Sequence, residues 1–352
     1  MSKAMATAEI SLSSIESNFN QARLAAPNSQ VMAVVKANAY GHGAIKVAQR
    51  LTTADAFAVA RLDEAVQLRE AGIQQPITLF GGICQASQAE VATDFDIDLV
   101  IHDQAQLELI KGYSLRIWLK LDTGMHRLGI EAASIPLFVN AIAESRLLGL
   151  MSHFSDADQP SHPKNAQQLE TLLSVGETIG VPLSMANSAG ILSFPESHLD
   201  WVRPGIMLFG ANPLLDRTVD LSAAMRLTAP VIAVKNIRPG ETIGYGSTWT
   251  ASSPGRIGVI GLGYADGYPR EIAKGTRVYL NGYEEEIVGR ISMDMLSVSF
   301  SSEQTAQLGD MAELWGQRIP IESIAGQAET LSYTLMCNVS SRVPRSYTET
   351  SG

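Results

Sequence analysis

One lysine of this 352-residue chain ends an apolar segment and begins a polar, glycine-containing loop, Val34-Val35-Lys36-Ala37-Asn38-Ala39-Tyr40-Gly41-His42-Gly43. A lysine at the end of a buried strand is partly desolvated, and desolvation favours the neutral amine that forms Schiff bases. A lysine whose ammonium group reaches solvent at the strand end is the structural alternative. The polar side chains and glycines that follow Lys36 favour a functional loop.

A second group of charges lies in the segment Lys120-Leu121-Asp122-Thr123-Gly124-Met125-His126-Arg127-Leu128-Gly129. Three charged side chains within eight residues at a strand end are compatible with a structural ion pair or with a binding site. His153 ends another apolar run, Gly149-Leu150-Met151-Ser152. It is either a core or rim residue or a site residue.

Two further strand ends are rich in small residues, Ala186-Asn187-Ser188-Ala189-Gly190 and Val202-Arg203-Pro204-Gly205-Ile206. Such loops expose backbone N–H groups, and barrel proteins often bind phosphate in the loops after their last two strands. A phosphate site together with a Schiff-base lysine predicts the cofactor pyridoxal 5′-phosphate.

The C-terminal part of the chain has three glycine-rich segments, which surround Tyr245, Tyr264 and Met293. Tyr245 lies between Gly244 and Gly246, which would permit close approach of another surface. A hairpin with an ordinary cross-strand aromatic residue is the alternative. Neither the GxGxxG nor the GxxxxGK[ST] pattern occurs between a strand and a helix, so a dinucleotide or ATP site is unsupported.

The elements that must position these residues are predicted from apolar, β-branched runs. Eight such runs alternate with stretches of helical patterning, which is typical of a parallel sheet. The runs are 31–35, 56–60, 77–80, 97–101, 116–121, 147–151, 183–186 and 201–207. Their number and spacing favour a closed (β/α)8 TIM-like barrel over residues 1–225, with an open doubly wound sheet as the alternative.

Residues 226–352 have a different pattern. Short strand-like runs are separated by turn signals such as Pro239-Gly240 and Asn281-Gly282, and helical patterning almost vanishes. The sequence therefore predicts a second, mostly β domain.

Composition narrows the class of partner. The 36 acidic and 26 basic residues leave a net charge of −10, which disfavours nucleic acid and anionic membranes. The two cysteines lie far apart and outside any metal-ligand spacing, so neither a metal site nor a disulfide framework is predicted. No signal peptide or membrane-length apolar run occurs, so we expect a cytoplasmic protein with a small-molecule substrate.

The motifs around Lys36 and Asp122 closely resemble those of bacterial alanine racemases, whose fold is a barrel followed by a β domain, and the resemblance extends over nearly the whole chain. The resemblance implies that Lys36 binds pyridoxal phosphate as a Schiff base and that Tyr40 reaches its phosphate. It further implies that Ser188, Gly205 and Ile206 bind the phosphate, and that Arg127 holds the cofactor's phenolic oxygen and the substrate carboxylate.

The resemblance also implies a two-base mechanism. Racemisation needs acid/base groups on both faces of the α-carbon, and Lys36 and Tyr245 match the family's pair. Arg203 would face the pyridine nitrogen, and His153 would support the ring and hydrogen-bond toward Tyr245. In this family the tyrosine comes from the partner subunit, so a homodimer is expected, in which Met293 contacts the substrate carboxylate and Tyr264 narrows the entrance.

The implied activity is interconversion of L- and D-alanine, which supplies D-alanine for peptidoglycan. Three positions deserve comparison with the family: Ser341 stands where a tyrosine is common, Ser292 where a cysteine is common, and Lys120 matches a lysine that some relatives carbamylate. A roomier pocket with some serine turnover is expected from Ser341. The alternatives are a serine or broad-specificity racemase, a barrel-type decarboxylase, a non-catalytic pyridoxal-phosphate carrier, and a scaffold protein.

Overall fold

The computed structural model describes residues 6–142 and 146–349. The chain forms two compact units. The barrel unit comprises residues 16–208 and 212–221, and the β unit comprises the other described residues. The chain passes from the β unit to the barrel unit within helix α1 (Leu12–Ala25).

The core of the barrel unit is a closed ring of eight parallel strands, because the last strand pairs with the first. All five residues of strand β5 are buried, which illustrates why the barrel strands form continuous apolar runs in the sequence. The structure confirms the predicted barrel and excludes the open sheet. The strands are β2 (Gln30–Val34), β3 (Ala56–Val59), β4 (Ile77–Leu79), β5 (Ile97–Ile101), β6 (Arg116–Lys120), β7 (Arg146–Met151), β8 (Leu183–Ser184) and β9 (Trp201–Val202).

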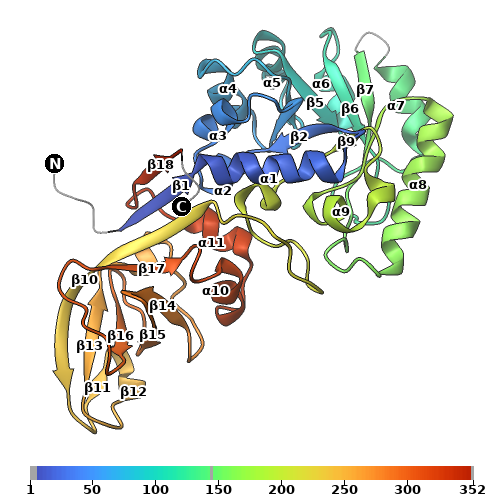
Figure 1. Ribbon diagram of the computed structural model, residues 1–352. Coiled ribbons are helices and arrows are strands. Elements are labelled where there is room, and N and C mark those ends of the chain that lie inside the picture. The colour runs from blue at the N-terminus through green and yellow to red at the C-terminus, as the bar shows by residue number, and fades with distance from the viewer. Residues whose placement is uncertain (1–5, 143–145, 350–352) are drawn as a thin grey trace. The chain divides into compact units, whose positions relative to one another are not determined.

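Helices cover the outside of this ring (Figure 1). The longest, α8, has 17 residues and ends at Gly180, whose φ of 70° is a left-handed conformation that glycine adopts without a Cβ penalty. Besides α1, the helices are α2 (Lys36–Tyr40), α3 (Ala44–Arg50), α4 (Leu62–Glu70), α5 (Ala86–Asp94), α6 (Ala105–Leu109), η1 (Ala132–Ser134), α7 (Ile135–Ala141), α8 (Pro163–Ile179), α9 (Ser188–Ser193), η2 (Pro195–Ser197) and η3 (Ile206–Phe209).

The β unit contains a mostly antiparallel sheet with the strand order β13-β16-β15-β14-β17-β10-β1-β18, and a separate hairpin, β11-β12. The predicted mostly β architecture is confirmed. The elements are β1 (Thr7–Ser11), β10 (Met225–Ile237), β11 (Thr242–Ile243), η4 (Tyr245–Ser247), β12 (Trp249–Thr250), β13 (Gly255–Ile260), η5 (Tyr264–Asp266), β14 (Arg277–Leu280), β15 (Tyr283–Val288), β16 (Leu296–Phe300), β17 (Met311–Trp315), α10 (Ile321–Gln327), α11 (Ser332–Asn338) and β18 (Arg345–Thr348).

One predicted turn shows how local sequence sets this sheet. Asn281 and Gly282 join β14 to β15 with φ angles of 49° and 96°. Two consecutive positive φ angles are typical of a type I′ turn, for which Asn-Gly is the preferred pair.

The structure differs from the sequence prediction in two respects. Residues 6–15 belong to the β unit and not to the barrel, because β1 pairs with β10 and β18. Two seven-residue helices, α10 and α11, also lie in the segment that was expected to be almost free of helix. Each spans only about two helical turns, which gives too few apolar positions for a helical pattern to be recognised in the sequence.

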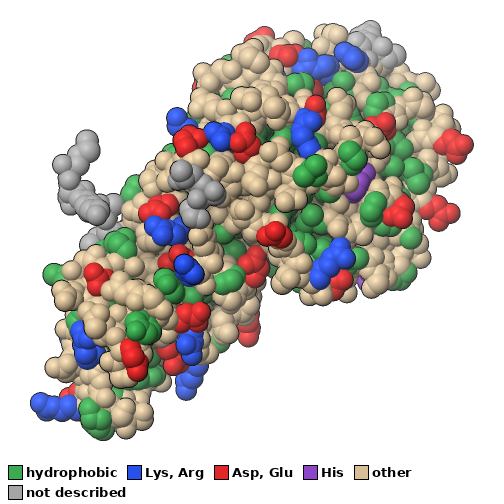
Figure 2. Space-filling model, in the orientation of Figure 1, with side chains coloured by type: hydrophobic (Ala, Val, Ile, Leu, Met, Phe, Trp, Pro, Cys, Tyr) green, Lys and Arg blue, Asp and Glu red, His purple; other side chains and the backbone are tan. Residues whose placement is uncertain are grey.

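Acidic and basic side chains are interspersed on the face shown in Figure 2. Among the described residues, no helix has the length and apolar character that crossing a membrane requires.

Candidate active site

The loop after β2 has an unusual backbone that carries Lys36. The four residues that follow Lys36, from Ala37 to Tyr40, have φ angles of 52–53°, which is the left-handed region. That conformation costs a non-glycine residue roughly 1–2 kcal/mol, and such strain tends to occur at functional sites. The neighbouring structure must therefore hold this turn in place.

Glu64 of α4 supplies part of that support. Its Oε1 accepts a hydrogen bond from the Ala37 N–H at 2.6 Å, and its Oε2 accepts from the Ala60 N–H at 2.9 Å. Farther along the loop, Asn38 Oδ1 accepts from the Ala44 N–H, and His42 Nδ1 lies 3.0 Å from the carbonyl oxygen of Ala39. Asn38 and His42 thus stabilise the loop, and Lys36 and Tyr40 remain its candidates for chemistry.

Asp122 organises the loop after β6 that carries Arg127. Its Oδ1 accepts from the Gly124 N–H at 2.9 Å, and its Oδ2 lies 3.0 Å from His126 Nδ1. These hydrogen bonds are among the causes that lower the pKa of Asp122. Its charge is therefore committed to the loop, and no ion pair with Lys120 or Arg127 forms among the described residues.

The electrostatics of Lys120 show that cations converge at the carboxyl ends of the strands. Burial, followed by the positive charges of Arg203, Arg127 and Lys36, lowers the pKa of Lys120 to about 7. About half of the Lys120 side chains are therefore neutral near pH 7. An anionic ligand would relieve this repulsion.

Arg203 is buried beneath this group, where it donates to Ser184 Oγ, the Ser152 carbonyl and the Met185 carbonyl. Burial lowers the pKa of Arg203 to about 10, so it stays cationic at neutral pH. Its Nη2 also lies 3.4 Å from His153 Nδ1. Because a guanidinium group can only donate, His153 Nδ1 is the acceptor and its proton lies on Nε2.

The same environment keeps His153 neutral. Burial and the charges of Arg203 and Lys120 lower the pKa of His153 well below its usual value. The backbone carbonyl of His153 accepts from Gln168 Nε2 at 3.0 Å, which also ties the residue to α8. The ring is thus a neutral donor in a fixed position.

The loops after β8 and β9 meet the Tyr40 hydroxyl. Ser188 Oγ accepts from the N–H groups of Gly205 (2.8 Å) and Met207 (3.3 Å). A Cβ at position 205 would lie 2.6 Å from Tyr40 Oη, so this approach requires glycine. Two hydroxyls and the backbone of Gly205 and Ile206 thereby come together at one end of the barrel.

This donor set fits pyridoxal 5′-phosphate. Hydroxyl and backbone N–H groups bind phosphate, and the surrounding cations balance its charge. Lys36 provides an amine for the aldehyde. Among the described residues, no group of three or more His, Cys, Asp or Glu side chains is arranged to hold a metal ion.

The candidate residues of the β unit lie on loops and are exposed. Tyr245 begins η4 and is 73% exposed, with Gly244 and Gly246 on either side at φ angles of 71° and 73°. Tyr264 begins η5 and is 37% exposed, whereas Met293 is 52% exposed. Ser341, which follows α11, is also exposed.

The structure thus brings the predicted barrel residues together at one end of their strands. Three supporting residues were not predicted: Glu64, Ser184 and Gln168. Glu64 has a sequence signal, since it is the third residue of α4 and accepts from the backbone N–H before the helix, as in a capping box. Ser184 and Gln168 carry no comparable signal, because their partners are distant in sequence.

Comparisons with known proteins agree with this geometry. Residues 10–213 match the family model "Alanine racemase, N-terminal domain", and residues 224–347 match "Alanine racemase, C-terminal domain". An alanine racemase of Nitrosococcus oceani is 43% identical over 347 residues, which cover 96% of this chain and 97% of that protein.

Solved structures give the same result. The biosynthetic alanine racemase from Pseudomonas aeruginosa is similar to this chain with a TM-score of 0.94 and 41% identity, covering 98% of this chain and 100% of that one. The alanine racemase from Bartonella henselae, described with covalently bound pyridoxal phosphate, has a TM-score of 0.91 and 29% identity, covering 98% of this chain and 100% of that one.

Proposed function

This chain belongs to the alanine racemase family and interconverts L- and D-alanine with pyridoxal 5′-phosphate, and we propose that Lys36 and Tyr245 are its two acid/base groups. The observation that carries the proposal is the cluster of cations at the carboxyl ends of the strands, where Arg203, Arg127 and Lys36 all lower the pKa of Lys120. The D-alanine product supplies peptidoglycan synthesis.

The cofactor, when bound, supplies the conjugated ring that acidifies the α-hydrogen of the amino acid. Lys36 would bind its aldehyde carbon, and Tyr40, Ser188, Gly205 and Ile206 would hold its phosphate. Arg203 would face the pyridine nitrogen. Because Arg203 can only donate, and its hydrogen bonds go to a serine hydroxyl and two backbone carbonyls, it would leave that nitrogen unprotonated and disfavour side reactions that need a stronger electron sink.

Lys36 moves a proton on one face of the α-carbon and Tyr245 moves a proton on the other. In the proposed dimer, the neutral His153 would present its Nε2–H to the hydroxyl oxygen of the partner's Tyr245, a bond that favours the phenolate form, which can accept a proton. Arg203 maintains this tautomer of His153 through the 3.4 Å contact with Nδ1. Proton transfer on either face of the α-carbon therefore does not require a histidine that changes its protonation state.

The active site is completed by a second copy of the chain. Tyr245, Tyr264 and Met293 are exposed on the β unit, where a partner's barrel site can receive them. In that arrangement the Met293 backbone N–H and the Arg127 side chain bind the substrate carboxylate, and Tyr264 narrows the entrance. A homodimer with two shared sites follows.

Lys120 supports Arg127. With a pKa of about 7, its amine is sufficiently neutral to react with carbon dioxide, and the resulting carbamate would pair with Arg127. The only two cysteines, Cys84 and Cys337, are exposed and lie far apart in the sequence, which suits a reducing compartment, so we place the enzyme in the cytoplasm.

Complementation between two inactive variants tests the shared site. Lys36→Ala and Tyr245→Phe are each expected to be inactive as pure holoenzymes. After subunit exchange in an equal mixture, about half of the dimers are mixed and each holds one intact site, which restores about a quarter of wild-type racemisation.

A mixture that stays inactive while subunits exchange would show that Lys36 and Tyr245 do not act across two chains. Deuterium exchange at the α-carbon then separates the two bases. In Tyr245→Phe, one enantiomer is expected to keep exchanging through Lys36 while the other stops. Equal loss for both enantiomers would contradict the two-base assignment.

A further inference from the structure

Arg342 links the two loops of the β unit that carry proposed substrate contacts. Its Nη2 lies 2.7 Å from Asp294 Oδ1, and its Nε lies 3.4 Å from Asp266 Oδ1. Asp294 directly follows Met293, and Asp266 ends the short helix η5 that begins with Tyr264. We propose that Arg342 is a positioning residue for racemisation, which aligns the Met293 loop for the substrate carboxylate; this inference rests on the proposed function.

Asp266 is the fixed end of this link. Its side chain is only 9% exposed, and its Oδ2 accepts from the Gly263 N–H at 3.0 Å. Its backbone carbonyl accepts from the Ser340 N–H at 3.0 Å, two residues before Arg342. Asp266 is therefore held through both its side chain and its backbone carbonyl.

The two loops also contact each other directly. The Tyr264 N–H donates to the Ser292 carbonyl at 3.1 Å, and the Ala265 N–H donates to the Met293 carbonyl at 3.0 Å. A Cβ on Gly263 would lie 2.3 Å from the Ser292 carbonyl oxygen, which leaves no room between the loops. Movement of one loop must therefore move the other.

Asp294, at the tip of the Met293 loop, depends more strongly on Arg342 than Asp266 does. The Asp294 side chain is 50% exposed, and its carboxylate is held by the Arg342 ion pair. Without Arg342, this carboxylate would stand unbalanced beside the position proposed for the substrate carboxylate and would repel it. Arg342 therefore contributes both geometry and charge compensation.

Arg342→Ala tests this role, and Arg226→Ala is a matched control. Arg226 belongs to the same unit, is 49% exposed and pairs with Glu9 at 2.7 Å, away from these loops. For the Arg342→Ala holoenzyme we expect about a tenfold weaker inhibition by propionate, a carboxylate without an amine, and a similar rise in KM. We expect little change in kcat, and faster amide exchange at residues 263–266 and 292–295.

Arg342→Lys is a milder variant, which keeps the charge but not the two-pronged geometry, and it should fall between wild type and Arg342→Ala. Asp294→Asn should add little to Arg342→Ala, because both remove the same link. The inference is overturned if Arg342→Ala matches Arg226→Ala in propionate inhibition or in amide exchange. Failure of the proposed function is recognised separately, by a Tyr245→Phe enzyme that remains active.

Discussion

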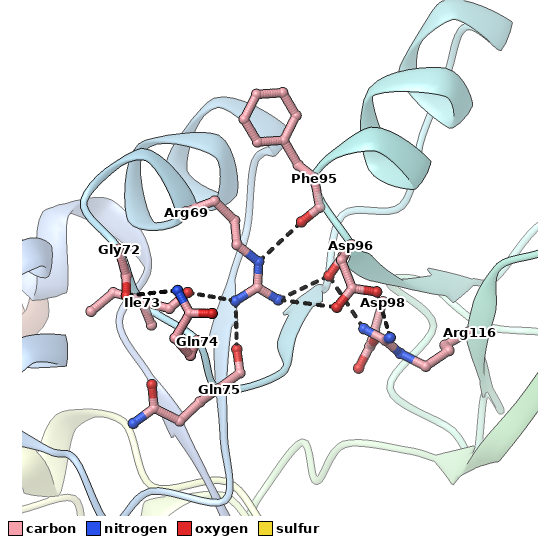
Figure 3. Close-up of polar contacts among 9 residues, drawn as sticks. All are labelled: Arg69, Gly72, Ile73, Gln74, Gln75, Phe95, Asp96, Asp98 and Arg116. Carbon is pink, nitrogen blue, oxygen red and sulfur yellow. Dashed lines mark hydrogen bonds and ion pairs between the residues drawn. The ribbon is translucent and has the colours of Figure 1, made fainter.

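Both ends of the barrel hold charged side chains, but the charges at the amino end are paired, whereas those at the carboxyl end are mostly of one sign. At the amino end, Arg69 and Arg116 meet Asp96 and Asp98, so that cations and carboxylates alternate (Figure 3). At the carboxyl end, Lys120 is surrounded by the cations named above, while the nearby Asp122 is committed to its own loop. The charges at the amino end balance one another, whereas the cations at the carboxyl end would be balanced by an anionic ligand.

The amino end is also saturated with hydrogen bonds. Arg69 donates to the carbonyl oxygens of Ile73 (2.8 Å), Gln75 (2.7 Å), Phe95 (3.0 Å) and Asp96 (2.9 Å), as Figure 3 shows. These bonds join α4 to the segments before β4 and β5. This end of the barrel therefore stabilises the fold.

The comparison shows that a shifted pKa alone does not identify an active site. Burial raises the pKa of Asp98 to about 6, and burial lowers the pKa of Lys120 to about 7. Asp98 nevertheless has a direct cationic partner in Arg116, whereas like charges surround Lys120. Charge imbalance, and not the pKa shift, distinguishes the end of the barrel that we propose to be catalytic.

The largest expected effect comes from Lys36→Ala. Removing the amine would abolish the proposed covalent link to the cofactor and one of the two proposed bases, so racemisation should fall by at least about 10³-fold. Optical rotation and cofactor absorbance measure these two losses.

Lys46→Ala is the control for this substitution, since Lys46 is an exposed lysine of the neighbouring helix α3. It should retain full activity. If Lys36→Ala binds the cofactor covalently and racemises alanine, the assignment of the carboxyl end is wrong.

At the opposite end, Arg116→Met should reduce stability without reducing activity. It leaves the Asp98 side chain, which is 4% exposed, without its partner, and such losses cost roughly 3–5 kcal/mol. The value of kcat/KM at saturating cofactor should stay within about twofold, because Arg116 lies at the other end of β6.

The pH dependence of this deficit follows from Asp98. Its folded-state pKa is raised to about 6 from 3.8, so its contribution to stability is fully present below pH 3.8 and is lost as the pH rises through 6. The destabilisation of Arg116→Met should therefore shrink between pH 7 and pH 5. A deficit that is equal at both pH values would show that Asp98 is not the cause.

A smaller effect on stability is expected from Lys120, whose contribution changes with pH in the opposite direction to that of Asp98. Its folded-state pKa is lowered to about 7 from 10.5, so the unfolded chain binds more protons between these values and stability rises with pH there. Lys120→Met should remove a slope of up to about 1 kcal/mol per pH unit in the cofactor-free protein. Lys46→Met should leave the slope unchanged, and an unchanged slope in Lys120→Met would contradict the clustering of cations.

The smallest effect is expected from Asp96→Asn. The Asp96 side chain is 69% exposed, so its pairs with Arg69 and Arg116 should contribute less than about 1 kcal/mol. Asparagine tolerates the left-handed φ of 52° at this position, which isolates the charge from the backbone. Unfolding at low salt and near 1 M salt should show a difference that disappears with screening. A larger, salt-independent loss would mean that Asp96 has a structural role besides its charge.

Much of the fold could be predicted because buried parallel strands are continuous apolar runs. The strands at the two ends of the chain, β1 and β18, could not be predicted. Both are short, and β1 pairs with the distant strand β10, for example at Thr7 and Thr228. Pairing across such a separation leaves no local pattern. The domain boundary was displaced for the same reason.

The candidate site divides in a similar way. Lys36, Arg203 and Ser188 could be proposed because they lie shortly after the ends of β2, β9 and β8, where barrel sites lie. Ser184, Gln168 and Arg342 escaped prediction, since each acts through partners in other elements. Their roles depend on which loops lie side by side.

By itself, the sequence determined the alternation of strands and helices, the family and the candidate residues of the site, because these depend on local pattern and residue type. Tertiary structure alone decided the electrostatics. Only folding brings four cations to one end of the barrel and pairs Arg116 with Asp98 at the other, since burial and proximity set the energy of a charge.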